Sequence, residues 1–154
     1  MSPFHALLAL HNLAALVWVG GMFFAWMILR PAAVSALQPP ERLRLWFDVF
    51  PRFFLWVWAA VLILPISGVG MLHMGFGGFA QMPFHVQLMI GLYLVMLSLF
   101  LRVQLLLLPP LRRAVEAGDW PAGGAALGDI RRMVGANLLV GVVLVFVAVA
   151  RPSF

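Results

Sequence analysis

Apolar residues fill four long stretches of the chain, and polar residues are largely confined to the connections between them. The stretches cover residues 4–29, 53–72, 84–108 and 133–150. Each approaches or exceeds the roughly 20 residues that a helix needs to cross a bilayer. Lipid offers no partner to unpaired backbone groups, and the stretches are too long and too evenly apolar for barrel strands. We therefore predict four transmembrane helices.

The composition supports this assignment and leaves no room for a second domain. Of 154 residues, 64% are hydrophobic and only 10% are charged, which is far from the balance of a soluble domain. We predict an all-α integral membrane four-helix bundle, with residues 1–154 as a single transmembrane domain. The start of the chain lacks the positive region of a signal peptide, so we expect it to remain as part of the first span.

Arginines predict the orientation of the bundle. Under the positive-inside rule, the connections after the first and third spans face the cytoplasm, because they carry eight arginines whereas Arg151 alone marks the opposite side. Both termini and residues 73–85 then lie on the outer face of a bacterial inner membrane. The net charge of +5 comes from arginines that flank the apolar stretches. We therefore expect them to contact the lipid bilayer and not to bind nucleic acid. The eight are Arg30, Arg42, Arg44, Arg52, Arg112, Arg113, Arg131 and Arg132.

Local signals predict how the spans end. Arg30-Pro31 is expected to stop the first helix and Pro109-Pro110 the third. Residues 39–47 are amphipathic and predict a short helix on the membrane surface, anchored by Trp46. Residues 116–120 and the glycine-rich stretch after them predict a similar but looser connection.

The predicted topology gathers all four histidines in the outer third of the bundle. His5 and His85 lie near the membrane boundary, and His11 lies about 9 Å deeper than His5 along its helix. Polar residues at that depth are costly, so His11 is the first candidate for a ligand or a proton-handling group, with an interhelical hydrogen bond as the alternative. His5, His73 and His85 are equally well explained as interfacial residues solvated by water.

Two cofactor chemistries fit these residues. Imidazole and thioether groups suit Cu(I), although methionine is also a common apolar filler. Glycines in the spans leave backbone surface bare, so haem b could lie between two helices with histidines as its axial ligands. Close packing of the helices explains the same glycines equally well. The copper candidates are His5, His11, Met71, His73, Met74, Met82 and His85, and the haem candidates are His11, His85 and His73.

Other polar residues within the spans are candidates for support. Asn12 adjoins His11, and Arg102 is expected to snorkel toward the cytoplasmic interface. Ser67, Tyr93, Gln87 and Asn137 are expected to hydrogen-bond between helices. The supporting polar set is Asn12, Gln87, Arg102 and Asn137.

The first span resembles the opening helix of the copper resistance protein D (CopD) family. A Leu-His, a Trp-x-Gly-Gly and a terminal Arg-Pro-Ala recur in that family. They stand here as Leu10-His11, Trp18-Val19-Gly20-Gly21 and Arg30-Pro31-Ala32. The resemblance implies copper uptake across the inner membrane.

The third and fourth spans are similar to the related HemJ family of four-helix protoporphyrinogen oxidases. The likeness rests on Phe84-His85-Val86-Gln87, on Arg132 through Asn137, and on Arg151-Pro152. Gln87 stands where that family has lysine, and Leu138 where it has glutamate. This resemblance implies bound haem b and an oxidoreductase as one candidate activity. Under either family His11 is the first candidate ligand and His85 the next.

Three functional hypotheses follow. The leading one is a haem b-binding protein of the CopD/HemJ-like group that handles electrons or protons near the outer face, with His11 and His85 as axial ligands. The alternative is a copper-binding transport protein that uses the outer histidines and methionines. The third is a non-catalytic accessory subunit. A homodimer, a redox partner or a larger membrane complex is compatible with all three.

Overall fold

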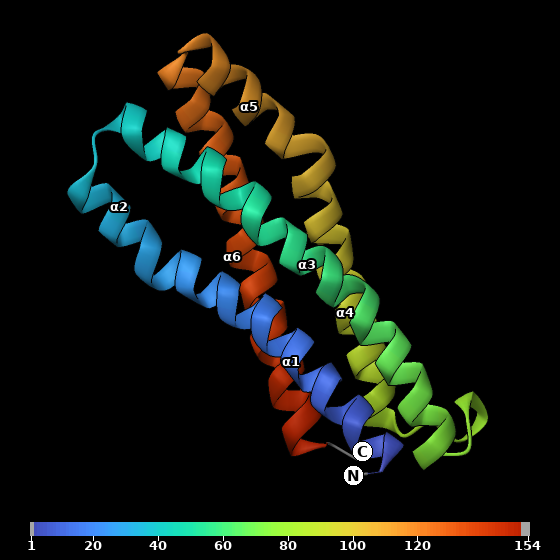
Figure 1. Ribbon diagram of the computed structural model, residues 1–154. Coiled ribbons are helices and arrows are strands. Elements are labelled where there is room, and N and C mark those ends of the chain that lie inside the picture. The colour runs from blue at the N-terminus through green and yellow to red at the C-terminus, as the bar shows by residue number, and fades with distance from the viewer. Residues whose placement is uncertain (1, 152–154) are drawn as a thin grey trace.

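Four long helical segments run along the molecule, and each is long and apolar enough to span a membrane (Figure 1). The structure is a computed structural model that describes residues 2–151. It confirms the predicted all-α bundle of four membrane-length helices. The elements are α1 (Pro3–Phe23), η1 (Phe24–Leu29), α2 (Arg30–Ala36), α3 (Pro39–Gly75), η2 (Phe79–Gln81), α4 (Phe84–Arg102), η3 (Val103–Leu107), α5 (Leu108–Ala117) and α6 (Trp120–Ala150).

The segments are arranged as two helix pairs. α1 packs mainly against α3, and α4 packs mainly against α6. The start of α1 and the end of α6 lie at the same end of the bundle (Figure 1). We name this the histidine end, because His5, His73 and His85 lie there, and we name the opposite end, where α2 meets α3 and α5 meets α6, the arginine end.

The proline pairs do not stop the helices, so that prediction was wrong. The first segment continues past Pro31 to Ala36, and the third continues past Pro109 and Pro110 to Ala117. A π-helical turn precedes each proline site. The N–H of Arg30 donates to the Ala25 carbonyl, and that of Leu108 donates to the Val103 carbonyl, five residues back in both cases. The wider turn makes room for the proline ring and redistributes the hydrogen bonds, so the helix axis continues.

The connections at the arginine end are tighter than predicted. Residues 39–47 do not form a separate surface helix but are the first turns of α3. This start is stabilised by a capping box, in which the Gln38 N–H donates to Glu41 Oε2 at 3.1 Å. Gly118, with a φ of 68°, ends α5, and the Asp119 carboxylate caps α6 by accepting from Ala122 N–H. The glycine-rich stretch after Trp120 is therefore helical and not a loose connection.

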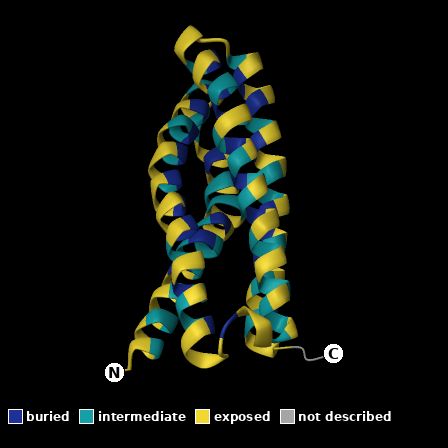
Figure 2. Cartoon of the chain, turned by 90° about the vertical axis from the view of Figure 1, so that its right-hand side faces the viewer, coloured by how far each residue is buried: buried dark blue, intermediate teal, exposed yellow. Residues whose placement is uncertain are grey.

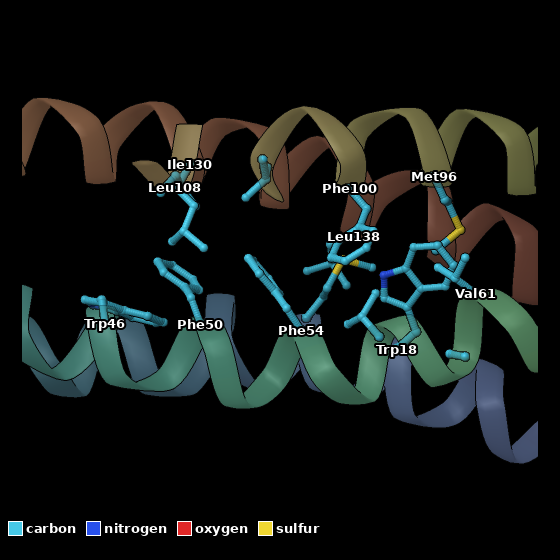
Figure 3. Packing of buried hydrophobic residues seen from close by; sticks show 14 of the residues in the cluster. Trp18, Trp46, Phe50, Phe54, Val61, Met96, Phe100, Leu108, Ile130 and Leu138 are labelled. Carbon is cyan, nitrogen blue, oxygen red and sulfur yellow. The ribbon is translucent and has the colours of Figure 1, made fainter. Parts of the chain in front are cut away.

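Buried side chains are concentrated in the centre of the bundle and at the arginine end (Figure 2). Trp46, Phe50 and Phe54 stack along α3, with ring centroids 5.2 and 5.5 Å apart. Figure 3 shows this row facing side chains from the other segments, among them Leu108, Ile130, Phe100 and Leu138. Interlocking aromatic and aliphatic side chains therefore hold the two helix pairs together here.

The outward faces of the helices are apolar. Leu55, Phe146 and Val149 are 72%, 71% and 80% exposed. A soluble protein rarely leaves so many large apolar side chains uncovered, whereas contact with lipid tails accounts for them. The chain is a multi-pass membrane protein.

Candidate functional site

His11 is held between the two helices of the first pair by a hydrogen bond to Ser67. Its Nδ1 atom lies 2.7 Å from Ser67 Oγ, and Ser67 Oγ lies 2.7 Å from the Ile63 carbonyl oxygen of its own helix. A carbonyl can only accept, so the single hydroxyl proton of Ser67 is donated to the Ile63 carbonyl and shared with the Leu64 carbonyl, which lies 3.2 Å from Oγ. Ser67 Oγ must then accept from His11 Nδ1–H. In the neutral imidazole, the other ring nitrogen, Nε2, then has a free lone pair.

The backbone of α3 is shaped to receive this imidazole. Gly68 lies under the ring, and a Cβ atom there would stand 3.4 Å from His11 Cε1. Pro65, one turn before Gly68 and Val69, has no N–H to donate to the Val61 carbonyl. The Tyr93 hydroxyl of α4 replaces that donor, at 2.7 Å from Val61 O. Next to His11, α3 therefore contains a proline, but the Val61 carbonyl that this proline leaves without a helical donor still accepts a hydrogen bond.

The other three histidines lie at the histidine end and do not join His11 in a cluster. His5 is exposed, with Nδ1 2.6 Å from Ser2 Oγ. His73 and His85 each pack edge-on against a phenylalanine of the segment between α3 and α4, Phe79 and Phe76 respectively. Among residues 2–151, no three His, Asp or Glu side chains gather closely enough to hold a metal ion by themselves. The predicted gathering of histidines at one end is present, but their convergence on one point is not.

The methionines proposed as copper ligands surround the same end. Met74 is 58% exposed, whereas Met71 and Met82 are partly buried. Met82 lies in the segment between α3 and α4, and its carbonyl accepts a hydrogen bond from Gln87 Nε2 at 3.2 Å. The three methionines therefore lie close in sequence to His73 and His85, at the histidine end of the bundle.

The supporting polar residues take different positions. Asn12 and Arg102 are exposed. Asn137 is buried, and its Nδ2 donates to the Met96 carbonyl at 3.1 Å. Ser67, Tyr93 and Asn137 make the interhelical hydrogen bonds that the sequence predicted, whereas Gln87 bonds locally. Pro152 lies outside the described residues.

A cavity at the arginine end was not anticipated. Sequence reasoning attributed its arginines to membrane topology alone. One sequence pattern does point to this cavity. Trp26 and Arg30 are four residues apart, a spacing that places both on one helix face.

Comparison with known proteins identifies the family. A family model described as copper resistance protein D matches residues 47–151, which include all of α4, α5 and α6 and most of α3. The match does not extend to the first span, where the Leu-His and Trp-x-Gly-Gly motifs lie. No curated protein and no solved structure matches the chain. Because the family model covers more than half of the sequence, the chain belongs to the CopD family.

Proposed function

We propose that this CopD-family protein handles Cu(I) in the membrane, with His11 as its intramembrane ligand. The family is described by copper resistance, and this supports copper as the cargo. The observation that carries the proposal is the hydrogen bond between His11 Nδ1 and Ser67, which in the neutral imidazole leaves the Nε2 lone pair free for a metal. A metal-bound histidine commonly donates its other ring N–H to a partner that fixes its orientation, and Ser67 occupies that role.

In this proposal the histidine end captures the ion before it reaches His11. Met71, His73, Met74, Met82 and His85 provide thioether and imidazole groups, which Cu(I) prefers over hard oxygen ligands. Their position at the mouth of the bundle suits transient capture and transfer better than tight storage. The ion then passes to His11, which is the next imidazole toward the middle of the membrane.

The orientation of the protein is part of the proposal. The arginine end faces the cytoplasm of a bacterium under the positive-inside rule, and the histidine end faces outward from the inner membrane. Copper captured outside would then move inward past His11. Labelling of a single cysteine placed at either end, with a reagent that cannot cross the membrane, reports the orientation directly.

The haem b hypothesis receives no support from these observations. The family description names copper and not haem. The Nε2 atom of His11 could ligate haem iron as well as copper, so the preference for copper rests on the family description.

The test is a Cu(I) titration of detergent-purified protein against a competing chromophoric chelator. His11→Ala is expected to weaken Cu(I) binding by about tenfold or more, equivalent to roughly 1.4 kcal/mol. His5→Ala is the matched control, because His5 is exposed and bonds only locally, and it is expected to change affinity by less than about twofold. Unchanged affinity in His11→Ala would overturn the assignment.

Two further measurements make the test specific. Ser67→Ala is expected to weaken Cu(I) binding by about tenfold, since loss of the partner of a ligating histidine typically costs that much, whereas Ser67→Thr retains the hydroxyl and is expected to bind normally. X-ray absorption at the copper edge should report nitrogen scattering that is weaker in His11→Ala than in the wild type. A purified protein that instead shows a Soret band, sharpened by dithionite, would restore haem b.

A further inference from the structure

A cavity of about 200 Å³ lies at the arginine end, between the first segment, α3 and α6. Each of these three segments contributes one arginine and one tryptophan to the lining. They are Arg30 and Trp26, Arg42 and Trp46, and Arg131 and Trp120. The remaining wall is apolar. The cavity therefore combines a cluster of positive charges with aromatic surfaces at one end of a membrane bundle.

The charges in this cavity are not neutralised by the acidic residues of the protein. Asp48 pairs with Arg52 and Asp129 pairs with Arg132, outside the cavity. Glu41 and Asp119 cap helices, and Glu116 is exposed on α5. None of the five carboxylates in the chain lines the cavity. The three lining arginines thus present an electrostatic site for an anion.

Arg30 is fixed in place but incompletely bonded. Its guanidinium carbon lies 4.2 Å from the centroid of the Trp26 ring. Trp26 in turn lies against Gly135 of α6, where a Cβ atom would stand 3.1 to 3.3 Å from the ring. The Nε atom of Arg30 is buried and has no hydrogen-bond partner. Burying a charged donor without an acceptor is costly, so an anion that supplies one would be bound favourably.

We propose that this cavity binds the phosphate group of an anionic phospholipid from the adjoining leaflet. Arginine matches phosphate oxygens with paired N–H donors, and tryptophan is favoured at the depth where headgroups meet lipid tails. The volume is below the roughly 300–1,000 Å³ of typical small-molecule sites, which suits a headgroup whose tails remain in the bilayer. Basic recesses between membrane helices bind anionic headgroups by this chemistry. The proposal does not depend on copper handling.

The test compares two neighbouring arginines in the purified protein. Arg131→Gln removes a charge from the cavity, whereas Arg132→Gln removes the same charge from outside it. Binding of dioleoyl phosphatidylglycerol is measured by native mass spectrometry and by the rise in the thermal midpoint. We expect Arg131→Gln to weaken binding by about tenfold, the loss of one charge-assisted contact, and Arg132→Gln to bind as the wild type does. Equal weakening in both variants, or none in either, would overturn the proposal.

Two further arms identify the source of the phosphate. Dioleoyl phosphatidylcholine has the same tails but no net charge, and it is expected to bind more weakly; equal binding would overturn the site. Inorganic phosphate is expected not to displace the lipid at millimolar concentration. If it does, the cavity takes phosphate from solution and the lipid assignment is wrong. Arg42→Gln repeats the comparison should Arg131→Gln fail to fold.

Discussion

The two ends of the bundle are built differently. At the arginine end, a row of stacked aromatic rings from Trp46 to Phe54 fills the space between the helix pairs. At the histidine end, neither the first ten residues of α1 nor the first turns of α4 contribute a buried side chain. Contacts there lie within the first pair, such as Phe4 against Gly75 and Leu7 against Gly70.

The two ends therefore differ in what they can contribute, since one is packed for stability and the other is more open to ions. We expect burial of the large rings at the arginine end to contribute most to the free energy of folding, because stabilisation in a packed interior grows with the contacts that each side chain makes. The histidine end has few buried contacts between the pairs, and regions of that kind open at lower free-energy cost. The proposed capture of copper needs access, and His73, His85 and their neighbouring methionines lie at this less tightly packed end.

The largest expected effect tests the packed side of this comparison. Phe54→Ala removes a ring that is 4% exposed and contacts Phe50 and Phe100. We expect it to lower the free energy of unfolding by about 3–5 kcal/mol. The measurement is unfolding of the detergent-solubilised protein, followed by circular dichroism during an SDS titration.

The matched control is Phe79→Ala, which removes the same ring from the histidine end, where it is 55% exposed. We expect a change within about 0.5 kcal/mol. Similar losses in the two variants would show that both ends carry the stability of the bundle, and the division drawn above would be wrong.

The sequence predicted the spans well because hydrophobic length is a strong signal, but it could not predict how prolines are accommodated. Pro31 and Pro109 look like helix stops, yet each follows a π-helical turn that no residue pattern announces. Likewise, topology placed the histidines at one end, but convergence depends on how the helices are rotated, and neighbouring residues point about 100° apart. His11 alone meets a partner across helices, because Ser67 and Gly68 happen to face it.

A smaller effect is expected where the two helix pairs are joined by a hydrogen bond. Tyr93→Phe removes the hydroxyl that bonds the Val61 carbonyl, which Pro65 has left without its helical donor. We expect a loss of about 1 kcal/mol in the free energy of unfolding. In a Pro65→Ala background the backbone N–H of residue 65 replaces the hydroxyl, so Tyr93→Phe should cost almost nothing. Equal costs in the two backgrounds would show that Tyr93 does not compensate for Pro65.

A small effect is also expected at Asn137, midway between the two ends. Its Nδ2 donates to the Met96 carbonyl, but that carbonyl lies inside α4 and already accepts a helical hydrogen bond. Its Oδ1 is buried and has no partner. Asn137→Leu therefore removes the unbonded Oδ1 atom and leaves no other polar group without a partner. Tyr93→Phe, in contrast, leaves the Val61 carbonyl without a donor. We expect the free energy of unfolding to change by less than about 1 kcal/mol in the same SDS titration. A loss above about 2 kcal/mol would contradict this expectation and show that the Asn137 side chain stabilises the bundle through its polar group.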